Sequence, residues 1–511
     1  MSPASAQAAP AGEATASAAF GPDALERLLT GIELSGTARR RLVEALDFAL
    51  PLMNDDLSRT EAAEFGLRLD ALVAGLDQVL SRQLDEVLHD PAFMDLERTW
   101  RSLKHLVDHA DLKENIKISL LDARKAELLC DLTDAPELSR SALYRLVYTA
   151  EYGQFGGEPF GALIGAYEMT ASPEDLALMR LLCTLGAMAH APFIASTSCS
   201  FLGLRRWSEL AGLTDFDSLF RQPRYAAWQA LRNFENARYL VLVLPGFLAR
   251  LPYSPGTNPV SSFNYLEAAV DADRDFVWGF PSLMLALKMA ESFARTRFCA
   301  SLVGLDGGGR IVGLPALEHE SMGRVQSRFS LQALVGERLE QKLTEEGFVP
   351  ISVREAVGSA AFYSAATALR PKSFAADRGG VEATFNHRIS TLLPYMMIVN
   401  RLAHYIKVIQ RENLGTWKDR LVLENELNTW LNRYVTDMDD PSPAIRGKRP
   451  LRYAKVEVSD VDGDPGWRRM TLKIKPHLKF MGASFTLSLV GRLDDEKGGA
   501  SGPPYSSVAA G

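Results

Sequence analysis

The chain has 511 residues, of which 47% are apolar and 23% charged, and its formal net charge is −7. A chain of this length buries enough surface to fold without disulfides or metals, and its composition excludes a charge-driven disordered protein. Bulk nucleic-acid binding is also excluded as a main role, because that role needs a surplus of basic residues.

The sequence shows no sign of membrane insertion or export. No apolar run reaches the roughly 18 residues that crossing a bilayer requires. The first 20 residues lack the Lys or Arg that precedes the apolar core of a secretory signal. The four cysteines are far apart and lack C-x-x-C spacing, which speaks against a disulfide framework and against zinc: Cys130, Cys183, Cys199 and Cys299. These features predict a cytoplasmic protein.

The N-terminal region predicts a loose arm followed by a short helix. Residues 1–20 are mostly small and polar and predict disorder. In the segment Asp23–Leu34, Asp23 is suited to cap a helix. The apolar residues of that helix form one stripe at helical spacing: Leu25, Leu28, Leu29 and Ile32. Such a short helix cannot bury its stripe by itself, so it either docks on another protein or folds back on this chain.

Further helices are expected over Thr37–Leu50 and Glu61–Leu88, the second with seven apolar residues in a helical period. Asp90 and Pro91 end that helix and begin the next, because Pro is tolerated in the first helical turn. The next helix carries Leu96, Trp100, Leu103 and Val107. The two long helices together predict a helical arm packed as a hairpin.

The middle of the chain alternates expected strands with expected helices. The strands are 116–120, 162–166, 193–197, 239–244, 301–305 and 348–352. The helices are 175–189, 283–294, 331–345, 383–412 with a kink at Pro394, and 421–436. This alternation predicts a mixed α/β body.

The C-terminal region predicts a β-meander. Apolar and polar residues alternate strictly in three segments, whose apolar members are Ala454, Val456 and Val458, then Met470, Leu472 and Ile474, then Phe485, Leu487 and Leu489. The first two segments are separated by the turn Asp462–Gly466. Residues 493–511 predict a flexible tail.

The search for chemistry gives no catalytic, cofactor-binding or metal site. Phosphate-binding glycine loops, nucleophile elbows and zinc-protease motifs do not occur. His105 and His109 have the spacing of a metal pair on a helix, but a third ligand is not evident. The segment 151–161 combines glycines with aromatic residues, and a ligand-binding loop would look similar.

Several long motifs, in order along residues 23–480, resemble the large sheath subunit family of the type VI secretion system, TssC. They are DPAFMDLERTWRSL at 90–103, EYGQFGGEPFGALIG at 151–165, AHAPFIAS at 189–196, ARYLVLVLPGFLARLPY at 237–253 and HRISTLLPYMMIVNRLAHYIKVI at 387–409. The resemblance implies a non-enzymatic contractile sheath related to phage tail sheaths. It also implies pairing with a small subunit, TssB, helical polymerisation around an Hcp tube on a baseplate, and disassembly by the ATPase ClpV.

The resemblance also suggests roles for particular residues. The strands containing Ala454, Val456, Val458, Met470, Leu472 and Ile474 are expected to join a sheet shared between subunits, because strand addition uses main-chain hydrogen bonds. The stripe Leu25, Leu28, Leu29 and Ile32 aligns with the family helix that ClpV recognises. A helix near residues 387–411 lines the lumen in related sheaths, which makes Arg401, Lys407 and Arg411 candidates for contact with the tube, with a buried helix whose charges are solvated as the alternative.

The expected organisation is an arm at 1–20, helices with the ClpV segment at 21–56 and a helical hairpin that pairs with the small subunit at 57–110. These are followed by an α/β sheath body at 111–450, C-terminal strands at 451–492 and a tail at 493–511. Two other functions stay open. One is a phage-derived sheath that acts without a small subunit, and the other is an α/β enzyme with a ligand site at 151–165.

Overall fold

The computed structural model describes residues 62–154, 156–261, 263–315, 317–321, 324–328, 330–354, 359–374, 378–412, 420–438, 441–460, 468–477 and 487–492. The chain divides into two compact units, one with residues 1–88 and 252–268 and the other with residues 89–251 and 269–511. The expected helix at Asp23–Leu34, the helix at Thr37–Leu50 and the tail at 493–511 lie outside the described residues. None of the described helices combines the length and the apolar character that crossing a bilayer requires.

The first unit contains the long helix α3 (Ala62–Leu88) and the segment 252–268. That segment contacts α3 through Tyr265, whose hydroxyl donates to Oδ1 of Asp85 at 2.6 Å. Much of the apolar stripe of α3 is solvent-exposed, including Val73, Leu76 and Leu80.

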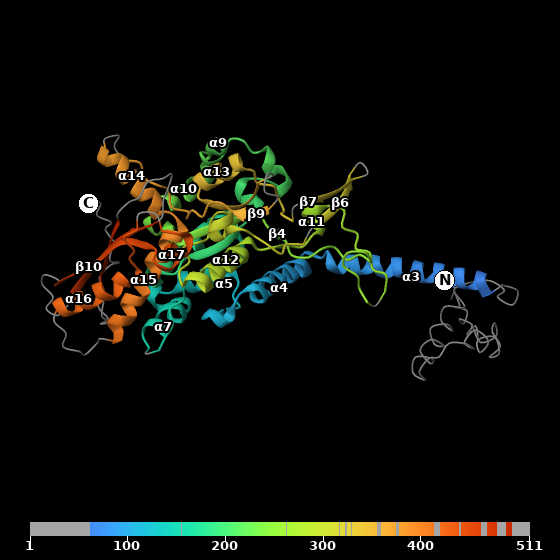
Figure 1. Ribbon diagram of the computed structural model, residues 1–511. Coiled ribbons are helices and arrows are strands. Elements are labelled where there is room, and N and C mark those ends of the chain that lie inside the picture. The colour runs from blue at the N-terminus through green and yellow to red at the C-terminus, as the bar shows by residue number, and fades with distance from the viewer. Residues whose placement is uncertain are drawn as a thin grey trace, which may run out of the picture. The chain divides into compact units, whose positions relative to one another are not determined.

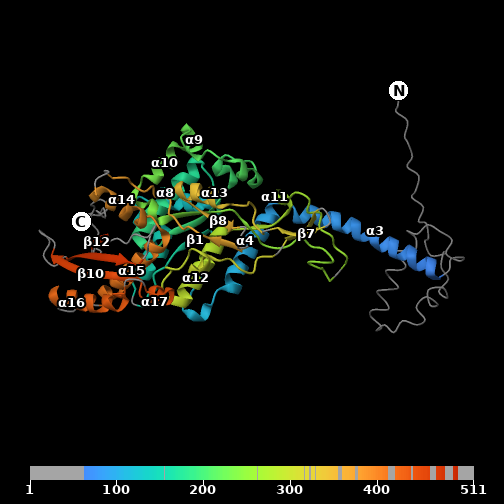
Figure 2. The same ribbon diagram turned by 45° about the horizontal axis from the view of Figure 1, so that its top comes forward.

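The second unit is built around a five-stranded sheet of order β1-β2-β3-β8-β9. The strands are β1 (Leu163–Met169), β2 (Phe193–Thr197), β3 (Leu240–Leu244), β8 (Phe348–Arg354) and β9 (Ser359–Phe362). The first four are parallel, and β9 is antiparallel to β8. The sheet and the helices between its strands confirm the predicted α/β body (Figures 1 and 2).

Both faces of this sheet are buried, because successive residues of a strand point to opposite faces. Leu240, Leu242 and Leu244 of β3 pack in a cluster with α8 (Pro173–Ala189). Val241 and Val243 pack in a second cluster with α12 (Pro281–Thr296). This burial on both faces explains why the central strands read as continuous apolar runs in the sequence.

The remaining short elements connect the parts of this unit. They are α5 (Lys125–Asp134), α6 (Ala142–Tyr144), α7 (Ala150–Tyr152), α9 (Phe216–Phe220), α10 (Ala226–Arg232), α11 (Ala272–Asp275), α13 (Glu337–Glu345), α17 (Pro443–Lys448), β4 (Phe247–Leu248), β5 (Trp278–Gly279), β6 (Leu317–Ser321) and β7 (Arg324–Arg328).

The helix α4 (Pro91–His109) begins where the sequence predicted. Asp90 is its N-cap and accepts hydrogen bonds from the main-chain N–H of Ala92 and Phe93. This cap satisfies two of the free N–H groups of the first turn. Whether α3 and α4 form a hairpin stays a prediction.

The C-terminal part of the same unit contains three helices and a second sheet. The helices are α14 (Arg378–Ser390), α15 (Leu393–Glu412) and α16 (Arg420–Leu431). The antiparallel sheet has the order β10-β11-β12, with strands Leu451–Asp460, Arg468–Pro476 and Leu487–Arg492. The predicted meander is therefore confirmed, although Phe485 lies outside the described residues.

Some expected elements are wrong. Residues 116–120 and 301–305 pair with no strand in the described part of the chain, because alternation specifies an extended backbone but not a partner. The helix expected from 331 begins only at Glu337, after Gly336 as its N-cap. The helix expected over 383–412 is split into α14 and α15 at Thr391, three residues before Pro394. Pro394 therefore lies in the first turn of α15, where the missing N–H costs nothing.

Candidate assembly interface

The C-terminal sheet presents one apolar face and one charged face. The apolar face carries Ala454, Val456, Val458, Met470, Leu472 and Ile474, and all six are buried. They pack in one cluster with side chains of α15 and α16, among them Leu402 and Leu427. The structure thus brings together the six residues named from the sequence, in a core that the chain builds for itself.

The opposite face of the sheet is charged and half-exposed. Glu457 lies between two lysines, with Nζ of Lys455 at 3.1 Å and Nζ of Lys473 at 2.9 Å from its carboxylate oxygens. The hydrogen bonds from the two lysines lower the pKa of Glu457. Such exposed pairs contribute little to stability, about 0–1 kcal/mol each. They give this face an alternating pattern of positive and negative charge.

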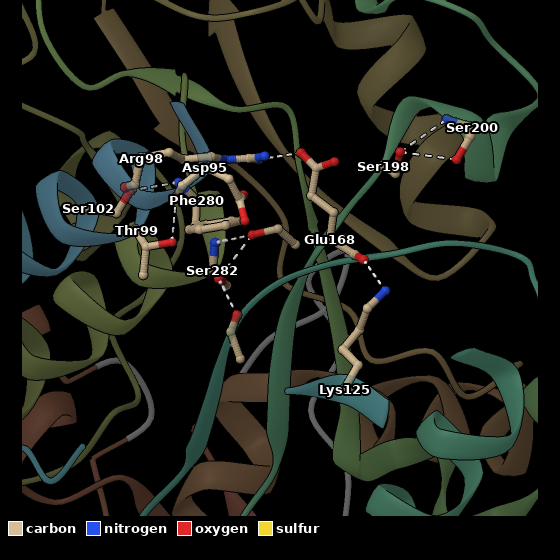
Figure 3. Close-up of polar contacts among 12 residues, drawn as sticks. Asp95, Arg98, Thr99, Ser102, Lys125, Glu168, Ser198, Ser200, Phe280 and Ser282 are labelled. Carbon is tan, nitrogen blue, oxygen red and sulfur yellow. Dashed lines mark hydrogen bonds and ion pairs between the residues drawn. The ribbon is translucent and has the colours of Figure 1, made fainter. Parts of the chain in front are cut away.

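Helix α4 has an unusual distribution of side chains. Its inner face is mixed: Leu106 packs in the core, Arg98 forms an ion pair with Glu168 of β1, and the Ser102 hydroxyl accepts from the main-chain N–H of Phe280 at 3.0 Å. Figure 3 shows the Arg98 and Ser102 side chains extending from α4 toward the sheet. The guanidinium of Arg98 also stacks 4.0 Å from the centre of the Phe280 ring.

The outer face of α4 is apolar and exposed. Phe93, Leu96, Trp100 and Val107 lie at the i, i+3, i+7 and i+14 spacing, and Trp100 is 59% exposed. An exposed stripe with a seven-residue repeat is typical of a surface that receives another helix. The sequence named Leu96, Trp100 and Val107 together with Leu103, which is only partly exposed, and it could not show that this side of the helix faces outward.

The three cations of α15 contact side chains or carbonyls of their own chain. Arg401 donates from Nη2 to the Tyr405 hydroxyl at 2.6 Å. Nζ of Lys407 lies 5.1 and 4.9 Å from the ring centres of Tyr148 and Tyr152. Each of these cations is only partly exposed. The Arg401 guanidinium also lies 4.6 Å from the centre of the Tyr405 ring, so aromatic faces stabilise the positive charge of both Arg401 and Lys407.

Polar groups of the glycine-rich segment 151–165 form hydrogen bonds within this chain. The Glu151 carboxylate accepts from the main-chain N–H of Glu158 at 2.7 Å, and the Tyr152 hydroxyl donates to the carbonyl of Ala189 at 2.9 Å. A hollow of about 440 Å³ lies elsewhere, lined by residues that include Arg98, Glu168 and Trp207 and none from 151–165.

The rings of His105 and His109 have their centres 4.3 Å apart and are tilted by 37°. Burial, with smaller electrostatic contributions from His109 and Lys288, lowers the pKa of His105 to about 4. Within the described ranges, no three His, Cys, Asp or Glu residues are grouped closely enough to hold a metal ion. The candidate ClpV residues Leu25, Leu28, Leu29 and Ile32 lie outside those ranges.

Comparison with known proteins places these features in a family. Residues 70–369 match the family described as EvpB/VC_A0108, tail sheath N-terminal domain, and residues 382–493 match its tail sheath gpW/gp25-like domain. The type VI secretion system sheath protein TssC1 of Pseudomonas aeruginosa PAO1 is 32% identical over 467 residues, which cover 90% of this chain and 91% of that protein. A chain in the baseplate of the anti-feeding prophage has a TM-score of 0.32 at 11% identity, over 77% of this chain and 83% of that one.

The chain is therefore a tail sheath subunit of the contractile, phage-like class. It belongs to the EvpB/VC_A0108 family, whose members include sheath proteins of type VI secretion systems. The resemblance noted in the sequence motifs is confirmed. The family is structural, so the residues that matter most are those that hold the fold and join neighbouring chains.

Proposed function

We propose that this chain pairs with the small subunit TssB in the cytoplasm and that the pairs polymerise helically around an Hcp tube on a baseplate. Contraction of the sheath expels the tube, and ClpV then dismantles the spent sheath. The chain performs no catalysis in this cycle. An extended sheath must be metastable toward the contracted lattice, so firing itself requires no nucleotide.

The observation that carries this proposal is the C-terminal sheet. Its apolar face is already covered by α15 and α16, which leaves its charged face and the β12 edge, which pairs with no further strand among the described residues, for contact with other subunits. Strand addition at such an edge gives affinity through main-chain hydrogen bonds. In this proposal the apolar face anchors the strands on α15 and α16, while their backbone joins the shared sheet. The anchoring residues are Ala454, Val456, Val458, Met470, Leu472 and Ile474.

Truncation after Leu451 tests this role. The shortened chain should still bind TssB but should form no tubules in electron micrographs, because it lacks the strands. Co-purification with TssB is the control for folding. Normal tubules from the truncated chain would refute the proposal, and tubules from the full-length chain without TssB would instead favour a phage-like sheath that needs no small subunit.

Pairing with TssB is proposed to use the helical segment 57–110. The exposed apolar stripe on α4 supports this, because an amphipathic helix of a partner can bury it. Replacing Leu96 and Trp100 by Ser should weaken co-purification with TssB at least tenfold. Replacing the exposed Lys104 on the same helix by Ser is the matched control and should have no effect.

Recognition by ClpV is proposed to use Leu25, Leu28, Leu29 and Ile32. Replacing Leu28 and Leu29 by Asp should abolish ClpV binding and leave assembly intact, because only the apolar stripe changes. Undiminished binding would count against this assignment.

Contact with the Hcp tube is proposed for Arg401, Lys407 and Arg411. Each exposed ion pair is worth at most about 1 kcal/mol, but helical repetition multiplies the contribution. Charge reversal to Glu at these positions should reduce tube-templated assembly while the pair with TssB is still recovered. Assembly that survives all three reversals would remove the tube-facing role.

A further inference from the structure

Residues 116–122, between α4 and α5, form a segment whose main chain has no partner. The segment runs to Arg124, the N-cap of α5, without a turn or a bend. Its main-chain N–H groups and carbonyls form no hydrogen bond with any other described residue. The residues on both sides of it are described as well, because the described chain has no gap between 62 and 154. A straight segment with unpaired main-chain groups is a template for pairing with another strand.

Side chains hold this segment beside β1, which is the edge strand of the central sheet. The hydroxyl of Tyr167 donates to the carbonyl of Ala123. Nζ of Lys125 donates to the carbonyl of Glu168 at 3.0 Å, a contact drawn in Figure 3. Ile118 packs against the core cluster on one face of the sheet. The segment is therefore ordered before a partner binds, which lowers the entropic cost of pairing.

The segment also exposes large apolar side chains. Leu120 is 68% exposed and Leu121 is 54% exposed. Successive residues of an extended chain point to opposite sides, so both sides of the segment present a leucine to solvent. Apolar side chains on both sides are typical of a strand inside a sheet, which indicates that another chain covers this segment.

The position of the segment in the chain indicates which partner covers it. Exposed apolar residues continue from the stripe on α4 to this segment: Trp100, Val107, Leu112, Leu120 and Leu121. His109, the last residue of α4, is seven residues from Ile116, so at most about 25 Å separates the two. A standard interface buries about 800 Å² on each partner, which is a patch of similar width. A partner that covers the α4 stripe can therefore also cover residues 116–122.

We propose that an extended segment of the small subunit TssB pairs with the main chain of residues 116–122 and so adds a strand beside the central sheet within each pair. The inference deepens the proposed function and rests on it, because it takes TssB as the partner of α4. The occupant is an extended backbone because only such a backbone presents N–H and carbonyl groups in series at the spacing of a strand.

Amide hydrogen exchange tests this assignment on the chain alone, on the unassembled pair with TssB, and on sedimented tubules. Peptides that cover 116–122 should exchange rapidly in the chain alone. In the pair, about half of their amides should slow at least tenfold, because alternate N–H groups point to the same side of a strand. Peptides that cover β3 should exchange slowly in all three preparations and are the internal reference.

Co-purification with TssB is recorded separately, so that the two proposals can fail independently. Co-purification without slower exchange at 116–122 would overturn the strand pairing and leave the pairing of subunits in place. Slow exchange of this segment in the chain alone would mean that the chain covers it by itself, which also overturns the proposal. Slower exchange that appears only in tubules would assign the occupant to a neighbouring sheath subunit instead of TssB. Absence of co-purification would refute the proposed function, and with it this inference.

Proline variants give an independent test, because proline has no main-chain N–H. Alternate N–H groups point to opposite sides, so either Ser119→Pro or Leu120→Pro removes one that faces the partner. One of these two variants should weaken co-purification with TssB at least tenfold. Ser119→Thr and Leu120→Val retain the N–H and are the matched controls, which should bind TssB normally.

The fold of the proline variants is checked by urea unfolding of the chain alone. Its midpoint should not change, because the N–H groups of Ser119 and Leu120 bond no other described residue. Normal binding of TssB by both proline variants would contradict the proposal. Equal losses of binding in the matched controls would assign the effect to the side chains and would also contradict pairing through the main chain.

Discussion

Nη1 of Arg411, in the last turn of α15, donates to the main-chain oxygens of Glu151 at 3.1 Å and Tyr152 at 3.3 Å. These carbonyls lie at the end of α7, where no further helical turn is available to bond them. Arg411, a candidate for contact with the tube, thus also joins two parts of its own chain that are distant in the sequence. Any charge change on α15 must therefore be tested for folding before it is interpreted as an effect on the tube.

Replacing Arg411 by Ala should lower the free energy of unfolding by about 1–2 kcal/mol, because it leaves two partly buried carbonyls without this donor. Arg411→Lys should lose less, since an ammonium can reach one of the two oxygens. Urea unfolding of both variants checks this. Unchanged stability in Arg411→Ala would mean that the contact contributes nothing in solution.

Arg232 of α10 is buried and forms an ion pair with Glu346, whose side chain is 13% exposed. Burial lowers the pKa of Arg232 to about 10 and raises that of Glu346. Arg232 also donates to the carbonyls of Glu345 and Ala368. Arg232→Met should therefore lower the free energy of unfolding by about 3–5 kcal/mol, because it leaves the largely buried carboxylate of Glu346 without its partner.

The more exposed pair Arg206–Asp271 is the control for this prediction. Arg206→Met should change the free energy of unfolding by at most about 1 kcal/mol, since solvent screens that pair. Equal losses in the two variants, measured by urea unfolding, would contradict the distinction between the buried and the exposed pair.

His404 should make the protein sensitive to acid. Burial lowers its pKa to about 4, aided by the positive charges of Lys407 and Arg401, although its hydrogen bond with the Ala189 carbonyl acts in the opposite direction. Because the unfolded chain binds a proton at this histidine near pH 6.5 and the folded chain does not, stability falls as the pH drops from about 6.5 to 4.

Between pH 7.5 and pH 5, His404 should account for a loss of about 2 kcal/mol in the free energy of unfolding. His404→Gln retains a donor for the carbonyl but does not titrate, so the loss between the two pH values should be smaller by about that amount. Urea unfolding at both pH values checks this. Equal losses in wild type and variant would show that His404 is not responsible.

Gly186 in α8 is required by close packing. A Cβ at this position would lie 2.7 Å from the Ala191 carbonyl oxygen and 3.1 Å from Cβ of Tyr239. Gly186→Ala should therefore cost about 1–3 kcal/mol through overpacking. Gly75 in α3 has open space at the same position, and Gly75→Ala should instead stabilise the helix by about 0.5–1 kcal/mol. Thermal unfolding of both variants checks the opposite signs.

Local sequence signals predicted the elements that are set by local chemistry. Strand β2 has the expected bounds because its apolar run follows Pro192, and α4 begins as expected because Asp90 caps it. The strict alternation in β10 and β11 predicted a meander with one buried face, and the register pairs Val456 with Leu472 on that face.

Features that depend on distant segments were not predictable. Residues 116–120 have the alternation of a strand, but pairing is decided by the segments around them. Asn428 would be taken for a solvated polar residue of an amphipathic helix, because its partner Val456 is 28 residues away. The sequence likewise gives no sign that the apolar stripe with Trp100 faces outward. The orientation of α4 depends on Arg98 and Ser102, whose partners, Glu168 of β1 and Phe280, are distant in the sequence.

Sedimentation of this chain expressed alone, with TssB, and with TssB after truncation at Leu451 tests the central claim most directly. We predict that the full-length chain and TssB sediment together in fixed proportion as hollow tubules, and that neither the chain alone nor the truncated pair does so. A full-length pair that stays entirely in the supernatant would contradict the account.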